Sequence, residues 1–294
     1  MDARWPSLPY PDWKATYATL HMWTQVVGKI ALATTPPLNH SWGTALQLGA
    51  RGLTTRPLYH GERRFTLAFD FVDHRLVVEL ADGTVRDLPL EPMTVADFYQ
   101  RVMALLADLG MSVHVWTMPV EIPDPIRFEQ DTIHHHYERD PVERLWTILQ
   151  SCERVMTARS CSFVGKCSPV HFFWGSFDLA VTRFSGRPAP PREGPAFMRE
   201  AYSHEVISHG FWPGNQTMPE PVFYAYAVPE PDGFKTARVE PEAAYYHREL
   251  GEFLLPYAAV YTAEDPDRTL ARFLDSTYEA GATFGAWNRE ALER

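Results

Sequence analysis

Residues 167–187 read CSPVHFFWGSFDLAVTRFSGR, and this stretch decides the fold class. Its aromatic and β-branched side chains have the composition of a buried β-strand. The stretch also carries His171, Asp178 and Arg183, and an ionisable group in such a place needs a partner to offset the cost of burial. Alternation along one continuous strand places His171 and Arg183 on one face and Trp174 and Asp178 on the other. The sequence therefore predicts a sheet with a polar pocket.

The remaining periodicities predict an α+β fold, with antiparallel strands in one or two sheets and four principal helices. Apolar residues three and four apart predict helices over 13–31, 94–109, 141–160 and 266–284. Alternating patterns predict strands over 42–50, 53–59, 65–71, 76–80, 203–208, 222–228 and 252–255. Three prolines in 119–125 predict an extended connector.

This connector divides the chain into two halves of similar order. Residues 1–128 are predicted to form a helix, a β-meander and a helix, and residues 129–294 a helix, strands and a helix. A repeated His–Trp pairing, at His40 and Trp42 and again at His171 and Trp174, favours an internal duplication. Coincidence between two aromatic-rich strands is the alternative. We expect the halves to form one compact unit.

Composition narrows the classes of partner. A formal net charge of −10, with no basic run, argues against nucleic acid. The chain has no apolar run near the ~20 residues that cross a bilayer, so no membrane association is expected. Its first residues do not resemble a signal peptide. Three cysteines without a CxxC pair fit a reducing compartment, and we expect a cytoplasmic protein.

Histidines in apolar strand contexts suggest a metal site. His40, His171 and His204 could supply three nitrogen ligands, with Glu205 or Glu252 as the carboxylate, which is typical of open zinc or non-haem iron sites. No HxH, HxxxH or HExxH spacing fixes two of these ligands on one element. A hydrogen-bonded core histidine is the alternative at each position. A divalent metal, zinc or iron, is thus one hypothesis, and the cofactor is not identified.

The same residues define a candidate active site. His171, His204 and Glu205 are the candidates for acid–base catalysis. Lys166 and Arg183 would hold an anionic group of a small molecule. The other candidate ligand-binding residues are Asn39, His40, Trp174, Tyr202 and Tyr224. Neither GxGxxG nor GxxxxGK[ST] occurs, so nucleotide cofactors lack their usual phosphate-binding loop.

Two functions remain open from the residues alone. The first is an enzyme that acts on a small molecule in a pocket lined by histidine and aromatic side chains, with or without a metal. The second is a non-catalytic ligand-binding or interaction protein, whose histidines satisfy hydrogen bonds in the core. Neither of these two functions predicts an oligomeric state.

Several long phrases together resemble one protein family. They are PPLNHSWG (36–43), ARGLTT (50–55), FDFVDHRL (69–76), MPVEIPDPI (118–126), GKCSPVHFFWGSFDLAVTRFSGR (165–187), REAYSHEV (199–206) and GEFLLPY (251–257). The chain is similar over nearly its whole length to a bacterial family of about three hundred residues, known only as a domain of unknown function. The resemblance implies one unit and carries over no catalytic role.

Overall fold

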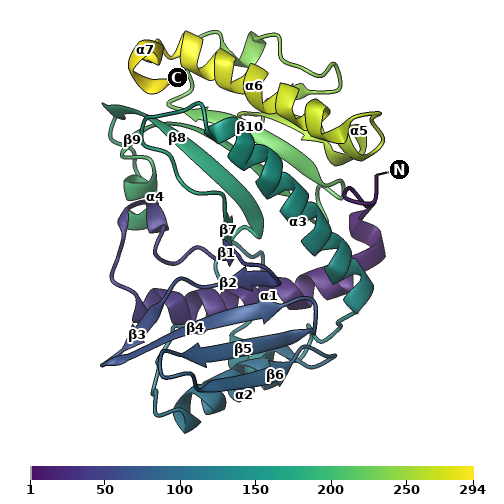
Figure 1. Ribbon diagram of the computed structural model, residues 1–294, viewed down its shortest axis with the longest axis vertical. Helices are drawn as coiled ribbons and strands as arrows, with labels where there is room; N and C mark the ends of the chain where they lie inside the picture. Colours follow the sequence, from purple (N-terminus) through teal and green to yellow (C-terminus); the bar gives the residue numbers. More distant parts are fainter. Residues whose placement is uncertain (1) are drawn as a thin grey trace. The chain divides into compact units, whose positions relative to one another are not determined.

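The computed structural model describes residues 2–294 and confirms the α+β fold class. Two antiparallel sheets of six strands each, together with seven α-helices, make up the described chain (Figure 1). By its internal contacts the chain divides into two compact units. The N-terminal unit comprises residues 11–146 and 172–177, and the C-terminal unit comprises residues 2–10, 147–171 and 178–294.

The N-terminal unit contains one long helix, a six-stranded sheet and a second helix. Its elements are α1 (Tyr10–Thr34), β1 (Gln47–Leu48), β2 (Gly52–Thr54), β3 (Leu58–His60), β4 (Arg63–Asp70), β5 (Arg75–Leu80), β6 (Val85–Pro89) and α2 (Val95–Asp108), with 3-10 turns at Asn39–Ser41 and Phe128–Gln130. The strand order is β1-β2-β4-β5-β6, and β3 pairs with β4.

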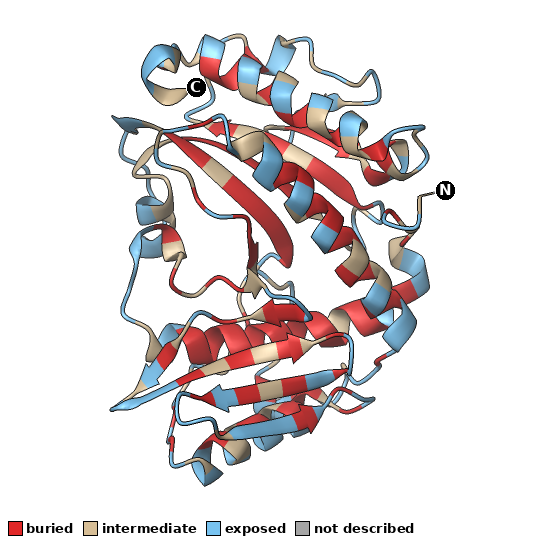
Figure 2. Ribbon diagram, viewed as in Figure 1, coloured by how far each residue is buried: buried red, intermediate tan, exposed pale blue. Residues whose placement is uncertain are grey.

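The hairpin predicted in this unit is confirmed. Phe65 pairs with Leu80 and Phe69 pairs with Leu76, so the alternating apolar residues of β4 and β5 share one face. Burial alternates along β4 accordingly (Figure 2). Thr94 caps α2 by accepting a hydrogen bond from the backbone N–H of Asp97 at 3.0 Å. Local periodicity and capping chemistry therefore suffice to specify this part of the fold.

The remaining elements form the second six-stranded sheet and its helices. They are α3 (Arg139–Ser160), β7 (His171–Phe173), β8 (Asp178–Pro188), α4 (Ala196–Ala201), β9 (His204–Trp212), β10 (Val222–Val228), a 3-10 turn at Phe234–Thr236, β11 (Tyr245–His247), β12 (Glu252–Pro256), α5 (Tyr257–Tyr261), α6 (Pro266–Phe284) and α7 (Arg289–Leu292). All of them belong to the C-terminal unit except α3 and β7, which have residues in both units. The strand order is β11-β12-β10-β9-β8-β7. The division at 128/129 and the internal duplication stay predictions.

The prediction of one continuous strand over 167–187 is wrong. A turn at residues 174–177 separates β7 from β8, and Phe177 in that turn has a φ of 60°. A left-handed residue reverses the chain direction, which ends the alternation of faces. The sequence of this turn is typical of a strand because Phe and Trp favour strands. His171 and Arg183 consequently lie on different strands.

The strand predicted over 42–50 is also mostly wrong. A 3-10 turn occupies Asn39–Ser41, and only Gln47–Leu48 pairs as β1. His40 and Ser41, just before the predicted strand, have positive φ values of 56° and 58°, and residues 42–44 continue the turn that they begin. Among residues 2–294, no helix is both long and apolar enough to span a membrane.

Candidate functional site

The sheet of the C-terminal unit has two chemically different faces. Strand β9 lies between β8 and β10. On one face, α6 packs against it: His209 Nε2 is 3.0 Å from Thr277 Oγ1, and Gly281 lies against Ile207. This face is the core of the unit.

The opposite face carries several ionisable side chains, and four of them, each from a different strand, form what we call the polar row. It consists of Asp178 (β8), Tyr224 (β10), Glu252 (β12) and His247 (β11). The Tyr224 hydroxyl donates a hydrogen bond to Asp178 Oδ2. His247 is directly opposite Glu252 in the antiparallel pair, which is the close cross-strand position. Asp178 is buried, whereas the other three are partly exposed, so solutes can reach them.

Gly210 allows the hydrogen bond between Tyr224 and Asp178 to form. Tyr224 must reach across β9 to contact Asp178 on β8. Gly210 is opposite Tyr224 in the β9–β10 register. A Cβ atom at Gly210 would lie 2.2 Å from the phenol oxygen of Tyr224 and 2.4 Å from the carbonyl oxygen of Leu179. Only glycine leaves room for the ring at this position.

Burial and a neighbouring charge perturb one carboxyl group of the polar row. Burial, and after it the negative charge of Asp178, raise the pKa of Glu252 from 4.5 to about 7. A carboxyl group with such a pKa exchanges protons readily near neutral pH. Burial and the nearby Asp178 also hold the pKa of the Tyr224 phenol well above its usual range, so Tyr224 remains a hydrogen-bond donor.

Further hydroxyl groups extend the polar row along the same face. The Tyr226 ring stacks on Tyr224, with ring centroids 6.0 Å apart and planes at 16°. Its hydroxyl is 3.1 Å from the hydroxyl of Tyr202. Next to it, Thr182 Oγ1 and Ser208 Oγ are 2.9 Å apart. Phenol rings with adjacent hydroxyls offer both an apolar surface and hydrogen bonds to a small polar molecule.

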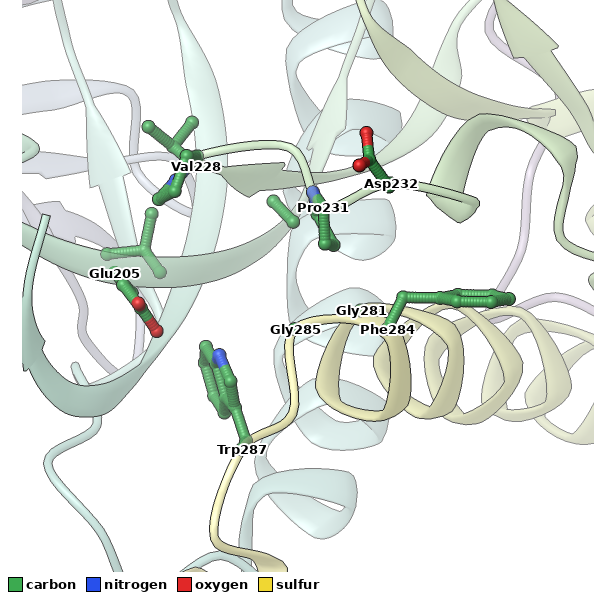
Figure 3. A pocket seen from close by; sticks show the side chains of 11 residues that line it. Glu205, Val228, Pro231, Asp232, Gly281, Phe284, Gly285 and Trp287 are labelled. Carbon is green, nitrogen blue, oxygen red and sulfur yellow. The ribbon is translucent and has the colours of Figure 1, made fainter. Parts of the chain in front are cut away.

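A separate pocket of about 280 Å³ lies on the α6 side of the unit. It forms where the ends of β9 and β10 meet the end of α6, and Figure 3 shows its wall. Glu205, Val228, Pro231, Asp232, Phe284 and Trp287 are among its lining residues. Ser185 and Arg187 hold the Glu205 carboxylate in place, with Arg187 Nη2 2.7 Å from Glu205 Oε2.

The structure brings together some of the residues predicted from sequence. Tyr202 joins Tyr224 through Tyr226 on the polar-row face. Glu205 lies in the pocket instead. Its neighbour His204 places Nδ1 3.1 Å from Ser203 Oγ. These predicted residues therefore lie at two places in the C-terminal unit.

Lys166, His171 and Arg183 differ in their surroundings. The Lys166 ammonium is 4.7 Å from the centroid of the Phe184 ring. His171 is 1% exposed, and burial lowers its pKa to about 4, so its imidazole is neutral at pH 7. Arg183, on the α6 side, donates a hydrogen bond to Arg159 O at 3.0 Å and lies 4.9 Å from the Tyr278 ring centroid. Of the three, Lys166 is exposed, whereas His171 and Arg183 are buried.

Three predicted ligand-binding residues belong to the N-terminal unit. Trp174 packs tightly on Gly28 and donates a hydrogen bond from Nε1 to Thr44 O at 3.0 Å. His40 is buried with its ring 5.5 Å from that of Trp42, and Asn39 is exposed.

Within residues 2–294, no group of three or more His, Cys, Asp or Glu side chains could hold a metal ion. His40 lies in the N-terminal unit, whereas His171 and His204 lie in the C-terminal unit. A metal site on these residues stays a prediction, and no step below depends on one.

The sequence pattern did not single out Tyr226 and His247, and it considered Glu252 only as a possible metal ligand and Asp178 only as a buried ionisable group. The available signal was the alternation of Tyr224 and Tyr226 along β10, which places both on one face. Their carboxylate partners follow only from strand register, since Asp178 lies 46 residues from Tyr224 in sequence.

The fold and the two sites define an α+β protein with a polar sheet face and a small acidic pocket. Residues 5–294 match the sequence profile of a family of unknown function (DUF5996), and the chain belongs to this family. Neither a curated protein nor a solved structure matches it. Function must therefore be argued from the geometry.

Proposed function

We propose that this protein is an enzyme that acts on a small polar molecule by acid–base chemistry at the polar row. The observation that supports this most strongly is Glu252, a partly exposed carboxyl group placed opposite His247 and close enough to Asp178 to respond to its charge. Perturbed ionisable groups that solutes can reach concentrate at functional sites.

Glu252 is the proton-transferring group in this proposal. Because its pKa is about 7, it can donate a proton to a substrate and recover one from water at neutral pH. Asp178 and Tyr224 are positioning residues: their hydrogen bond fixes the phenol across β9 and keeps a negative charge beside Glu252. His247, opposite Glu252, is the second group able to carry a proton.

Charge restricts the class of substrate. Two carboxyl groups on one face disfavour anions, and the raised pKa of Glu252 leaves that group partly neutral near pH 7. We therefore propose an uncharged molecule with hydroxyl or amide groups. The phenol rings of Tyr224 and Tyr226 would contact its apolar side, and the hydroxyl of Tyr202 would bind its polar groups.

The experiment incubates the purified protein with a mixture of small polar metabolites and follows their consumption by mass spectrometry. We expect at least one uncharged compound to be converted, with a rate that changes around pH 7. Glu252→Gln should lower that rate by roughly 10²- to 10⁴-fold, the usual contribution of a general acid or base. The matched control is Glu249→Gln, an exposed glutamate nearby, which should leave the rate unchanged.

Equal rates in wild type and in a folded Glu252→Gln variant would exclude the proposal. Binding of a compound without conversion would instead favour the non-catalytic function.

A further inference from the structure

The pocket beside α6 is a second place where a ligand would be recognised, independent of the polar row. Glu205 precedes Ile207 by two residues in β9, so both point to the α6 side of the sheet. The polar row lies on the other face. Figure 3 shows the Glu205 carboxylate and the Trp287 ring next to each other at the cavity wall.

The charges at this pocket favour a cation. Glu205 and Asp232 both line it. The carboxyl end of α6, a helix of 19 residues, ends at Phe284 in the same wall and adds the partial negative charge of its dipole. Arg187 provides one positive charge, but it is already engaged with Glu205 and with the carbonyl oxygens of Gly285 and Ala286.

Hydrogen bonding gives the pocket one acceptor and one donor for a ligand. Oε2 of Glu205 accepts the hydrogen bonds from Ser185 and Arg187. Its other oxygen, Oε1, accepts none from residues 2–294. Trp287 is 8% exposed, and its Nε1–H donates no hydrogen bond within the same residues. This nitrogen lies on the side of the indole that faces the cavity (Figure 3).

The remaining wall is apolar and small. Val228 and Pro231 line it together with the Trp287 ring. A volume of about 280 Å³ is at the low end for ligand pockets, which accommodates a molecule with a short carbon chain.

We infer that this pocket binds a small protonated amine that also carries a neutral oxygen acceptor, such as an amino alcohol. The ammonium donates to Glu205 Oε1 and is attracted by Asp232, while the neutral oxygen accepts from Trp287 Nε1–H. A carboxylate in place of the hydroxyl is repelled by the same two acidic residues. Binding at millimolar concentration requires both the ammonium group and the neutral oxygen of the ligand.

The test uses three probes of similar length: 4-amino-1-butanol, the zwitterion 4-aminobutanoate and the uncharged 1,4-butanediol. Each is titrated into the full-length protein labelled with ¹⁵N, and the indole N–H signal of Trp287 is identified by its loss in Trp287→Phe. We expect the amino alcohol to shift this signal at millimolar concentration, at least tenfold lower than either other probe.

Variants separate charge from shape. Glu205→Gln keeps the size of the side chain and removes its charge, and should weaken binding of the amino alcohol at least tenfold. Asp232→Asn, at an exposed loop position, should weaken it about threefold and serves if Glu205→Gln does not fold. Glu242→Gln, an exposed glutamate outside the pocket, should have no effect. Equal binding of the three probes, no shift of Trp287, or unchanged binding in the acidic-residue variants would each overturn the inference.

Discussion

Gly210→Ala is expected to destabilise the protein by about 3 kcal/mol, at the upper end for overpacking a tightly packed site. The added methyl group would lie 2.2 Å from the Tyr224 phenol oxygen and 2.4 Å from the Leu179 carbonyl oxygen. Moving the phenol breaks its hydrogen bond to buried Asp178, which leaves a carboxylate with fewer partners. Urea unfolding, followed by circular dichroism, measures the change in free energy.

Gly49→Ala is the matched control for this variant. Its added methyl group would meet only atoms at 3.5 Å, which is ordinary contact, and Gly49 is exposed. A change below 1 kcal/mol is expected there. If Gly210→Ala were as stable as wild type, Tyr224 would not lie across β9. The hydrogen bond between Tyr224 and Asp178 in the polar row would then be ruled out.

Glu252→Gln is expected to make the protein more stable at pH 8, by roughly 2 to 3 kcal/mol after allowance for partial exposure. The folded protein raises the pKa of Glu252 from 4.5 to about 7, so folding favours the protonated carboxyl group. The stability that Glu252 contributes is complete below pH 4.5 and is lost as pH rises through 7. Glutamine, which cannot ionise, avoids this loss.

The measurement compares urea unfolding of the variant and wild type between pH 4 and pH 8. We expect the two curves to meet near pH 4 and to separate steadily up to about pH 7. Glu249→Gln, an exposed glutamate, should follow wild type throughout. A constant difference at every pH would contradict a raised pKa for Glu252, and with it the proton-transfer role.

Much of the fold was predictable because its signals are local. The predicted bounds of β10 and α6 agree with those observed, Val222–Val228 and Pro266–Phe284. In α6, Asp265 accepts a hydrogen bond from the N–H of Arg268, and Pro266 follows as the first helical residue. A few adjacent residues determine such caps. The turn at 174–177 was missed because its positive-φ residue is Phe177, a type that seldom adopts that conformation.

The candidate site was less predictable because it depends on register. Tyr224 and Tyr202 were identified, but their partners Asp178 and Glu252 come from other strands. Strand pairing decides which residues of β8 and β12 lie on the same face of the sheet as Tyr224. A shift of one residue in that pairing would bring the other set of side chains to this face. No pattern within a single strand carries that information. The histidines, which attracted the metal hypothesis, are largely buried groups such as His171, at 1% exposure.

Because alternate residues of β9 serve the two sites, this strand should tolerate side-chain exchange far better than a change in length. Deleting one residue between Glu205 and Gly210 would either turn the glutamate away from the pocket beside α6 or replace Gly210 with a residue that has a side chain beneath the Tyr224 ring. Insertions and deletions among related chains should therefore avoid this segment and collect in the loops on either side of it.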